Sequence, residues 1–101
     1  MNSDQQLLVL SVPPALEDSL VDWLLENENC AGFTSSLAYG HSHNTQNYNL
    51  TEQVTGRQKR IQFQLFGNSQ ANRAIINGLE NEYKNSGLHY WLMPVIEEGR
   101  L

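Results

Sequence analysis

The sequence is poor in cysteine, in proline and in long apolar runs. The shortages of cysteine and of long apolar runs each exclude a class of protein. Its 101 residues include one Cys and three Pro. A single cysteine can form neither an intramolecular disulfide nor a zinc site built on cysteine ligands. The longest apolar run, Leu7 to Val12, is far shorter than the ~20 residues of a membrane-spanning helix. Because no Lys or Arg precedes this run, we expect no secretory signal and a cytoplasmic location.

The composition indicates one small globular domain spanning residues 1–101. The net charge is −5, so no basic surface for nucleic acid is expected. Hydrophobic residues make up 40% of the chain, enough for one core but not for two. Because a domain of this size buries a modest share of its surface, we expect self-association to add stability.

The hydrophobic periodicity predicts six elements in the order strand, helix, strand, strand, helix, strand. The first helix begins at Pro14, ends near residues 27–29 and buries Trp23 with its leucines. The second begins at the cap Ser69, continues through Asn77-Gly78 and ends before Gly87. The predicted strands cover residues 7–12, 33–40, 60–65 and 88–93, and residues 41–59 form a long loop without periodicity.

This order predicts an α+β protein with a ferredoxin-like βαββαβ sandwich. Right-handed crossovers place both helices on one face of a four-stranded antiparallel sheet, with the long loop between strands 2 and 3. We expect Leu8, Leu10, Val12 and either Tyr90 or Trp91 on the uncovered face. An exposed apolar face of this kind predicts a homo-oligomer.

Several spaced segments of the chain form a recognisable set: Val12-Pro13-Pro14-Ala15-Leu16-Glu17, Val21-Asp22-Trp23-Leu24-Leu25, Ala31-Gly32-Phe33-Thr34, residues 52–58 and residues 89–101. Together they resemble the PII-like signalling proteins, and more closely a proteobacterial branch that is often encoded beside heavy-metal efflux pumps. The resemblance implies a homotrimer with a projecting T-loop, which senses a small molecule or metal ion and regulates a protein partner such as an efflux transporter.

The resemblance does not extend to nucleotide binding. Nucleotide-binding members hold phosphates with a glycine-rich turn between the third strand and the second helix. The corresponding turn here, Phe66-Gly67-Asn68-Ser69, has one glycine, so we expect no adenine nucleotide in the usual manner.

Half of the six basic residues fall within four positions, as Arg57, Lys59 and Arg60. Arginine offers a planar fork of donors to phosphates and carboxylates, so these residues are candidates for binding an anionic effector. The resemblance adds Arg100, because the C-terminal segments of related proteins fold over an effector cleft; the alternative is that the end of this chain frays. The alternative is a solvated loop end with weak ion pairs.

His41 and His43 form the one metal-like pair. Residues two apart on an extended segment project to the same side, so both imidazoles could hold one divalent ion, completed by Cys30, His89 or a neighbouring subunit's carboxylate. The alternative is two solvated histidines. A metal-tolerance protein of the CutA type, or an accessory subunit of an efflux system, is therefore an alternative function. No nucleophile and base occur in a recognisable motif, so we expect no enzyme.

Overall fold

The computed structural model describes residues 4–43 and 49–101. Their elements are β1 (Gln5–Val12), the 3-10 turn η1 (Pro14–Leu16), α1 (Glu17–Glu26), β2 (Phe33–Gly40), α2 (Leu50–Thr55), β3 (Gln58–Asn68), α3 (Ser69–Glu82) and β4 (His89–Pro94). All six predicted elements are present. The short helix α2 lies in the segment predicted as a loop, and residues 44–48 of that segment lie outside the described part of the chain.

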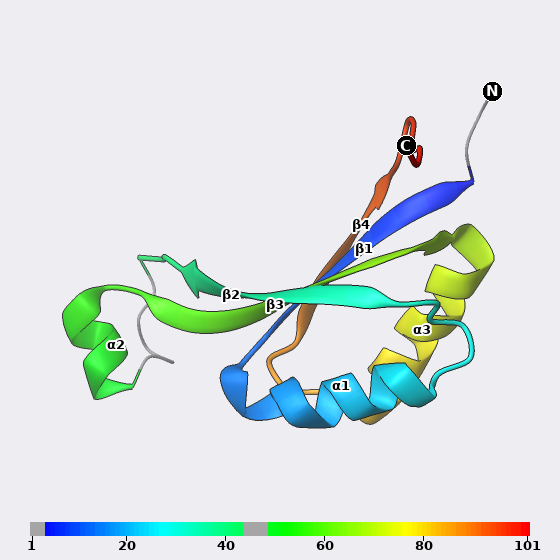
Figure 1. Cartoon of the computed structure of the whole chain (residues 1–101). Helices are drawn as coiled ribbons and strands as arrows, with labels where there is room; N and C mark the ends of the chain where they lie inside the picture. The colour runs from blue at the N-terminus through cyan, green and yellow to red at the C-terminus, as the bar shows by residue number, and fades with distance from the viewer. Residues whose placement is uncertain (1–3, 44–48) are drawn as a thin grey trace.

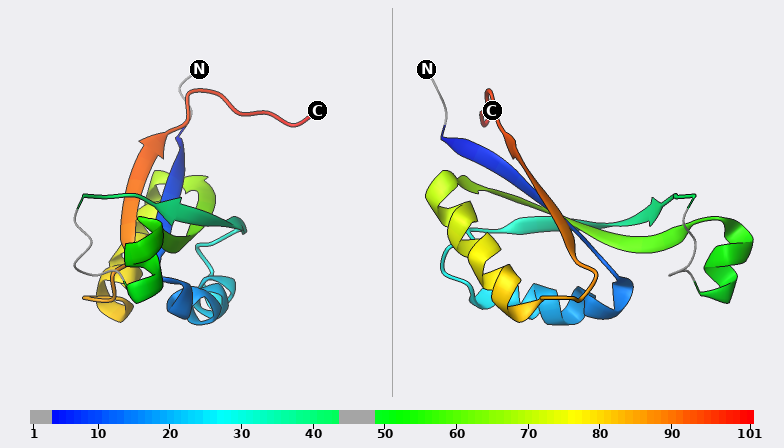
Figure 2. Two further views of the ribbon diagram at one scale, coloured as in Figure 1. Left: turned by 90° about the vertical axis from the view of Figure 1, so that its left-hand side faces the viewer. Right: turned by 180° about the vertical axis from the view of Figure 1, so that it is seen from behind.

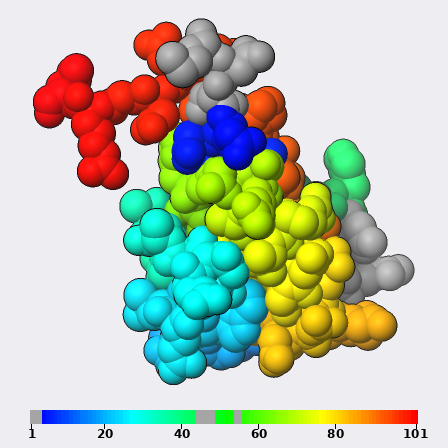
Figure 3. Space-filling view, turned by 90° about the vertical axis from the view of Figure 1, so that its right-hand side faces the viewer, coloured from blue at the N-terminus to red at the C-terminus, as the bar shows by residue number. Residues whose placement is uncertain are grey.

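The four strands form one antiparallel sheet in the order β2-β3-β1-β4. Both long helices lie on the same side of it (Figures 1 and 2). The predicted ferredoxin-like α+β fold is therefore confirmed. Figure 3 shows α1 (blue to cyan) and α3 (yellow) side by side on the outer surface of this helical layer.

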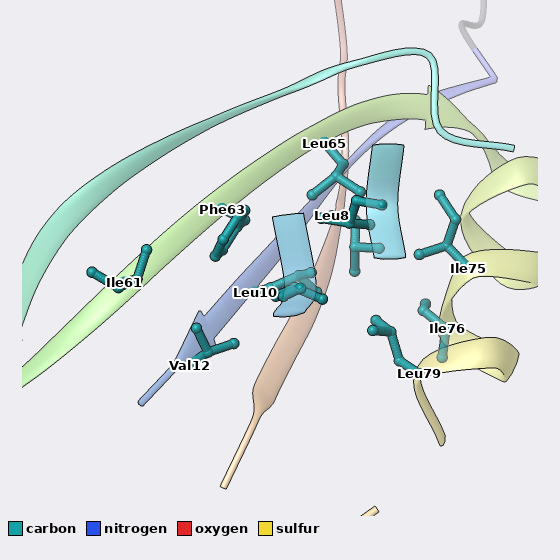
Figure 4. Close-up of a cluster of buried hydrophobic side chains, with 11 residues drawn as sticks. Leu8, Leu10, Val12, Ile61, Phe63, Leu65, Ile75, Ile76 and Leu79 are labelled. Atoms are coloured by element: carbon teal, nitrogen blue, oxygen red, sulfur yellow. The ribbon is translucent and has the colours of Figure 1, made fainter. Parts of the chain in front are cut away.

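The core lies between the sheet and the two helices. Leu8, Leu10 and Val12 of β1 pair with Leu65, Phe63 and Ile61 of β3, so all six side chains point to the helical side (Figure 4). Ile75, Ile76 and Leu79 of α3 and Leu20 and Leu24 of α1 complete the cluster. Phe33 extends it onto β2, with its ring 5.7 Å from that of Phe63.

The prediction that Leu8, Leu10 and Val12 lie on the uncovered face is wrong. All three are fully buried, at 0% exposure. The run from Leu7 to Leu10 is apolar on both faces, so alternation alone did not decide which face the helices cover. The uncovered side, here called the open face, is partly apolar: it carries Leu7, Val9, Phe66, Trp91 and Met93 beside the polar Ser11, Gln62 and Gln64.

The ends of the helices follow from capping. Pro14 opens η1, and Glu17 and Asp18 lie in the first turn of α1, where carboxylates favour the positive end of the helix dipole. Asn68, not the predicted Ser69, caps α3, because its side chain accepts a 2.8 Å hydrogen bond from the Ala71 N–H. The Ser69 hydroxyl instead donates to Asp4 at 2.9 Å, which ties this corner to the start of β1.

Gly78 in the middle of α3 is explained by the contact between the two helices. A Cβ placed on Gly78 would lie 2.7 Å from Cζ2 of Trp23 and 3.0 Å from Cη2. The Trp23 ring is held in place by an edge contact with Tyr83, at 6.0 Å between ring centroids. A glycine therefore allows α1 and α3 to approach closely, and Asn77-Gly78 continues the helix as predicted.

No helix in the described ranges, 4–43 and 49–101, is long and apolar enough to cross a bilayer.

We expect Gly78→Ala to destabilise the protein although alanine favours helix. The helix-propensity gain is at most about 1 kcal/mol, whereas forcing a methyl group into a filled contact costs about 1–3 kcal/mol. Denaturant unfolding at fixed protein concentration measures the balance. Asn77→Ala, on the exposed side of the same helix, is the matched control and should leave stability equal or higher. A Gly78→Ala protein as stable as the wild type would contradict this packing.

Candidate functional site

The β2–β3 hairpin extends beyond the rest of the sheet. β1 ends at Val12, which pairs with Ile61, so the pairs Ala38↔Arg60, Tyr39↔Lys59 and Gly40↔Gln58 have no third strand beside them. We call residues 38–43 and 49–60 the arm. In Figure 1 it projects away from α1 and α3 and carries α2 near its end.

Helix α2 is fixed at both ends. The Asn49 side chain accepts from the Glu52 N–H at 2.8 Å, and the Glu52 carboxylate accepts from the Asn49 N–H at 3.0 Å, which is a complete capping box. Gly56 ends the helix in the left-handed conformation, at φ 72°. The second Glu52 oxygen accepts from the Lys59 N–H at 3.2 Å, so one carboxylate joins α2 to β3.

A polar pocket of about 360 Å³ lies on the arm between β2, β3 and α2. The Arg57 guanidinium lies 4.0 Å above the centroid of the Tyr39 ring, a cation–π geometry that orients the planar donor fork. Lys59 pairs with Tyr39 across the strands and lines the same pocket. Asn49, Thr51 and Glu52 complete the lining. Two cationic side chains outnumber the one carboxylate, that of Glu52, so the lining carries a net positive charge that favours a small anion.

Arg60 does not line this pocket with Arg57 and Lys59. Successive residues of a strand point to opposite faces, so Arg60 projects from the other side of β3. Its Nε donates to the Ser11 hydroxyl at 3.0 Å, and its Nη2 donates to the carbonyls of Ser11 at 2.7 Å and Gly87 at 2.8 Å. Burial lowers the pKa of the guanidinium from its ordinary value. Arg60 therefore ties the root of the arm to β1 and to the loop before β4.

Arg100 lies in a different region from the arm pocket. It lines a cavity of about 490 Å³ with Gln5, Ala31, Gly32, Phe66, Glu98 and Gly99. Val95 is held by its N–H donating to the Gln5 carbonyl at 3.1 Å, and the chain beyond it projects from the body (Figure 2). Of the four predicted effector residues, the structure therefore brings only Arg57 and Lys59 together within one chain. Arg60 and Arg100 lie elsewhere.

His41 and His43 follow the end of β2 and are exposed. Cys30 precedes the other end of β2, a strand whose eight residues span roughly 26 Å at about 3.3 Å each, so it cannot join them within one chain. His89 lies against Trp91 on the open face, 5.2 Å between ring centroids. In the described part of the chain no three His, Cys, Asp or Glu side chains are grouped to hold a metal ion. Burial raises the pKa of the Cys30 thiol, which disfavours the thiolate that metals require.

Four pocket residues were not predicted: Tyr39, Asn49, Thr51 and Glu52. The spacing Asn49-x-x-Glu52 is a capping-box signal that marks a helix start within the segment predicted as a loop. Tyr39 is the last aromatic residue of the alternating β2 pattern. The partners of Arg60, by contrast, come from Ser11 and Gly87, which no local pattern links to it.

Comparison with known proteins identifies the family. A family model described as "Protein of unknown function (DUF3240)" matches residues 2–101. The chain belongs to the DUF3240 family. A crystal structure of a DUF3240 protein from Shewanella baltica OS155 is 27% identical, with a TM-score of 0.77 and 98% coverage of both chains. A search of the curated proteins finds no match.

Two further structures share the fold of this DUF3240 protein. CPII, a nitrogen regulatory PII-like protein from Thiomonas intermedia K12 bound to ADP, AMP and bicarbonate, is 12% identical, with a TM-score of 0.65 and coverage of 90% of this chain and 91% of CPII. The periplasmic divalent cation tolerance protein CutA from Archaeoglobus fulgidus is 9% identical, with a TM-score of 0.69 and coverage of 95% and 87%. The predicted resemblance to PII-like proteins is thus confirmed for the fold.

We expect substitution of Arg60 to destabilise the protein more than substitution of Arg57. Arg60→Met removes three hydrogen bonds that join β3, β1 and the loop before β4, and should lower the free energy of unfolding by about 1–3 kcal/mol. Arg57→Met removes contacts of an exposed residue on the arm, among them the one with the Tyr39 ring, and should lower the free energy of unfolding less. Urea unfolding of both variants at one protein concentration makes the comparison. Equal losses would contradict the assignment of Arg60 to the root of the arm.

Proposed function

We propose that this DUF3240 protein is a PII-like regulatory protein that binds a small anionic effector on its arm and signals to a protein partner through it. The observation that carries the proposal is the pocket of Arg57, Lys59 and Tyr39 on a hairpin that extends past the third strand. The arm thus combines a ligand pocket with an exposed surface in one element.

The proposed mechanism is a shift among arm conformations. Two strands without a third neighbour have few tertiary contacts, so the arm can open locally while the core stays folded. An anion held by Arg57, Lys59 and the polar groups of α2 favours the conformation in which β2, β3 and α2 enclose it. Arg60 fixes the root of the arm, so the change is confined to the segment beyond it.

We further propose that the protein acts as a homotrimer whose open faces pack together. The apolar residues of this face support association: Phe66 is 46% exposed and Met93 is 41% exposed in the single chain. A closed ring of identical contacts would cover these side chains in every copy. We also propose a cytoplasmic location, from the lack of Lys or Arg before the first apolar run, and, from the resemblance, a transporter such as a metal-efflux pump as the partner. We propose no catalytic role.

A second candidate function is metal binding of the CutA type. The exposure of His41 and His43 on the arm supports it, because both imidazoles are accessible to an ion. The likeness in fold to a divalent cation tolerance protein also supports metal binding. With two histidines from one chain, the coordination needs ligands from another copy.

Calorimetric titration with inorganic phosphate, citrate, ADP, copper and zinc distinguishes these candidates. We expect phosphate or citrate to bind, and Arg57→Ala to weaken binding about tenfold by removing charge-assisted hydrogen bonds. Arg73→Ala, an exposed arginine on α3, is the matched control and should bind as the wild type does.

An anion whose affinity is unchanged in Arg57→Ala would contradict the arm pocket. Binding of copper or zinc that is lost in His41→Asn, with no anion binding, would favour the CutA-type function. No binding of any of these ligands would favour an accessory subunit without an effector.

A further inference from the structure

A cavity of about 510 Å³, separate from the arm pocket and from the cavity at Arg100, lies at the C-terminal end of α3. Its walls come from the last turns of α3, the turn that follows and the start of β4. The lining residues are Leu79, Glu80, Asn81, Tyr83, Lys84, Asn85, Leu88 and Tyr90. Its volume falls within the range of small-molecule sites, about 300–1,000 Å³. No element of the arm takes part.

The walls of this cavity are held by the fold itself. The Tyr83 N–H donates to the Leu79 carbonyl at 2.8 Å, and the Ser86 hydroxyl donates to the Tyr83 carbonyl at 2.6 Å. Asn85 adopts the left-handed conformation at φ 59°, which asparagine tolerates better than most residues. The Leu88 N–H donates to the Ser86 hydroxyl oxygen at 3.2 Å. These hydrogen bonds fix the shape of the turn that forms one wall of the cavity.

Tyr83, which lies between α3 and this turn, is also fixed from the other side. Its hydroxyl lies 2.7 Å from the Ser19 hydroxyl of α1, within hydrogen-bonding distance, and its ring packs against Trp23. A ligand entering the cavity therefore meets a wall that costs little further ordering.

The lining divides into an apolar part and a charged part. The half-buried Leu88 and the ring of Tyr90, which is 37% exposed, offer an apolar surface, and the buried Leu79 lies behind it. Glu80 and Lys84 carry opposite charges on the same cavity and are four residues apart, the spacing at which such residues pair on a helix. Lys84 lies beyond the end of α3, however, and within the described residues no ion pair joins it to Glu80.

The helix end adds to the charge pattern. The last carbonyls of α3 point along its axis toward the turn and give this end a partial negative charge, which favours a cationic group. One side of the cavity therefore suits an ammonium group, near Glu80 and the carbonyl end of α3. The Lys84 ammonium suits a carboxylate.

We propose that this cavity binds a small zwitterion with an apolar side chain, the chemical class of free amino acids. The ligand carboxylate pairs with Lys84, its ammonium with Glu80, and its side chain packs on Tyr90 and Leu88. The site is separate from the arm pocket and does not depend on the function proposed there.

Calorimetric titration of the full chain with L-phenylalanine and L-leucine tests the proposal. We expect saturable binding of at least one of them at millimolar concentration. N-acetyl-L-phenylalanine, which lacks the ammonium, and L-phenylalanine methyl ester, which lacks the carboxylate, should each bind about tenfold more weakly than phenylalanine.

Two variants test the roles of the Glu80 and Lys84 charges one at a time. Glu80→Gln should weaken phenylalanine binding and remove the discrimination against the N-acetyl compound, whereas Lys84→Met should remove the discrimination against the methyl ester. Both side chains are exposed, so the fold should be retained. Glu82→Gln and Arg73→Met, on α3 but outside the cavity, are the matched controls and should bind as the wild type does.

Absence of saturable binding by both amino acids would overturn the proposal. So would equal affinity for phenylalanine and its two derivatives, because the charge pair would then have no role. Because neither readout involves Arg57, failure here leaves the proposed arm function unaffected, and failure of the arm pocket leaves this site unaffected.

Discussion

The pairing of β1 with β3 is the constraint on which the structure depends. It aligns Leu8, Leu10 and Val12 with Leu65, Phe63 and Ile61, and these six side chains form the floor on which both helices pack. A shift of one residue would exchange the faces and expose this floor. Because the intervening residues Leu7 and Val9 are apolar as well, the same pairing creates a second apolar surface with no helix above it. The fold thus produces its own core and a surface suited to association.

The same pairing determines where the arm begins. β1 ends at Val12 while β2 and β3 continue, so the hairpin beyond that point lacks the neighbours that stabilise the rest of the sheet. Local contacts compensate: the capping box of α2, the bond from the Lys59 N–H to Glu52, and Arg57 above Tyr39. An element held by a few polar contacts on a rigid base can respond to an anion without disturbing the core.

Periodicity predicted the order and type of the six main elements, because apolar spacing differs clearly between helix and strand. It did not predict the face of β1, since Leu7 to Leu10 are apolar at every position. It also grouped Arg57, Lys59 and Arg60 by closeness in sequence, whereas the strand alternation separates Arg60 from the other two. Ser11 and Gly87, the partners of Arg60, are far from it in sequence and become its neighbours only when the sheet forms. Asn49-x-x-Glu52 was a readable signal, but the surrounding segment lacks the apolar spacing that would have indicated a helix.

Hydrogen exchange with and without inorganic phosphate or citrate tests most directly whether the arm responds separately from the core. We expect one of these anions to slow amide exchange in residues 38–43 and 49–60 and to leave exchange in β1, α1 and α3 unchanged. Slower exchange throughout the chain would indicate general stabilisation and would contradict a separate arm. No change in the arm with either anion would contradict the pocket formed by Arg57 and Lys59.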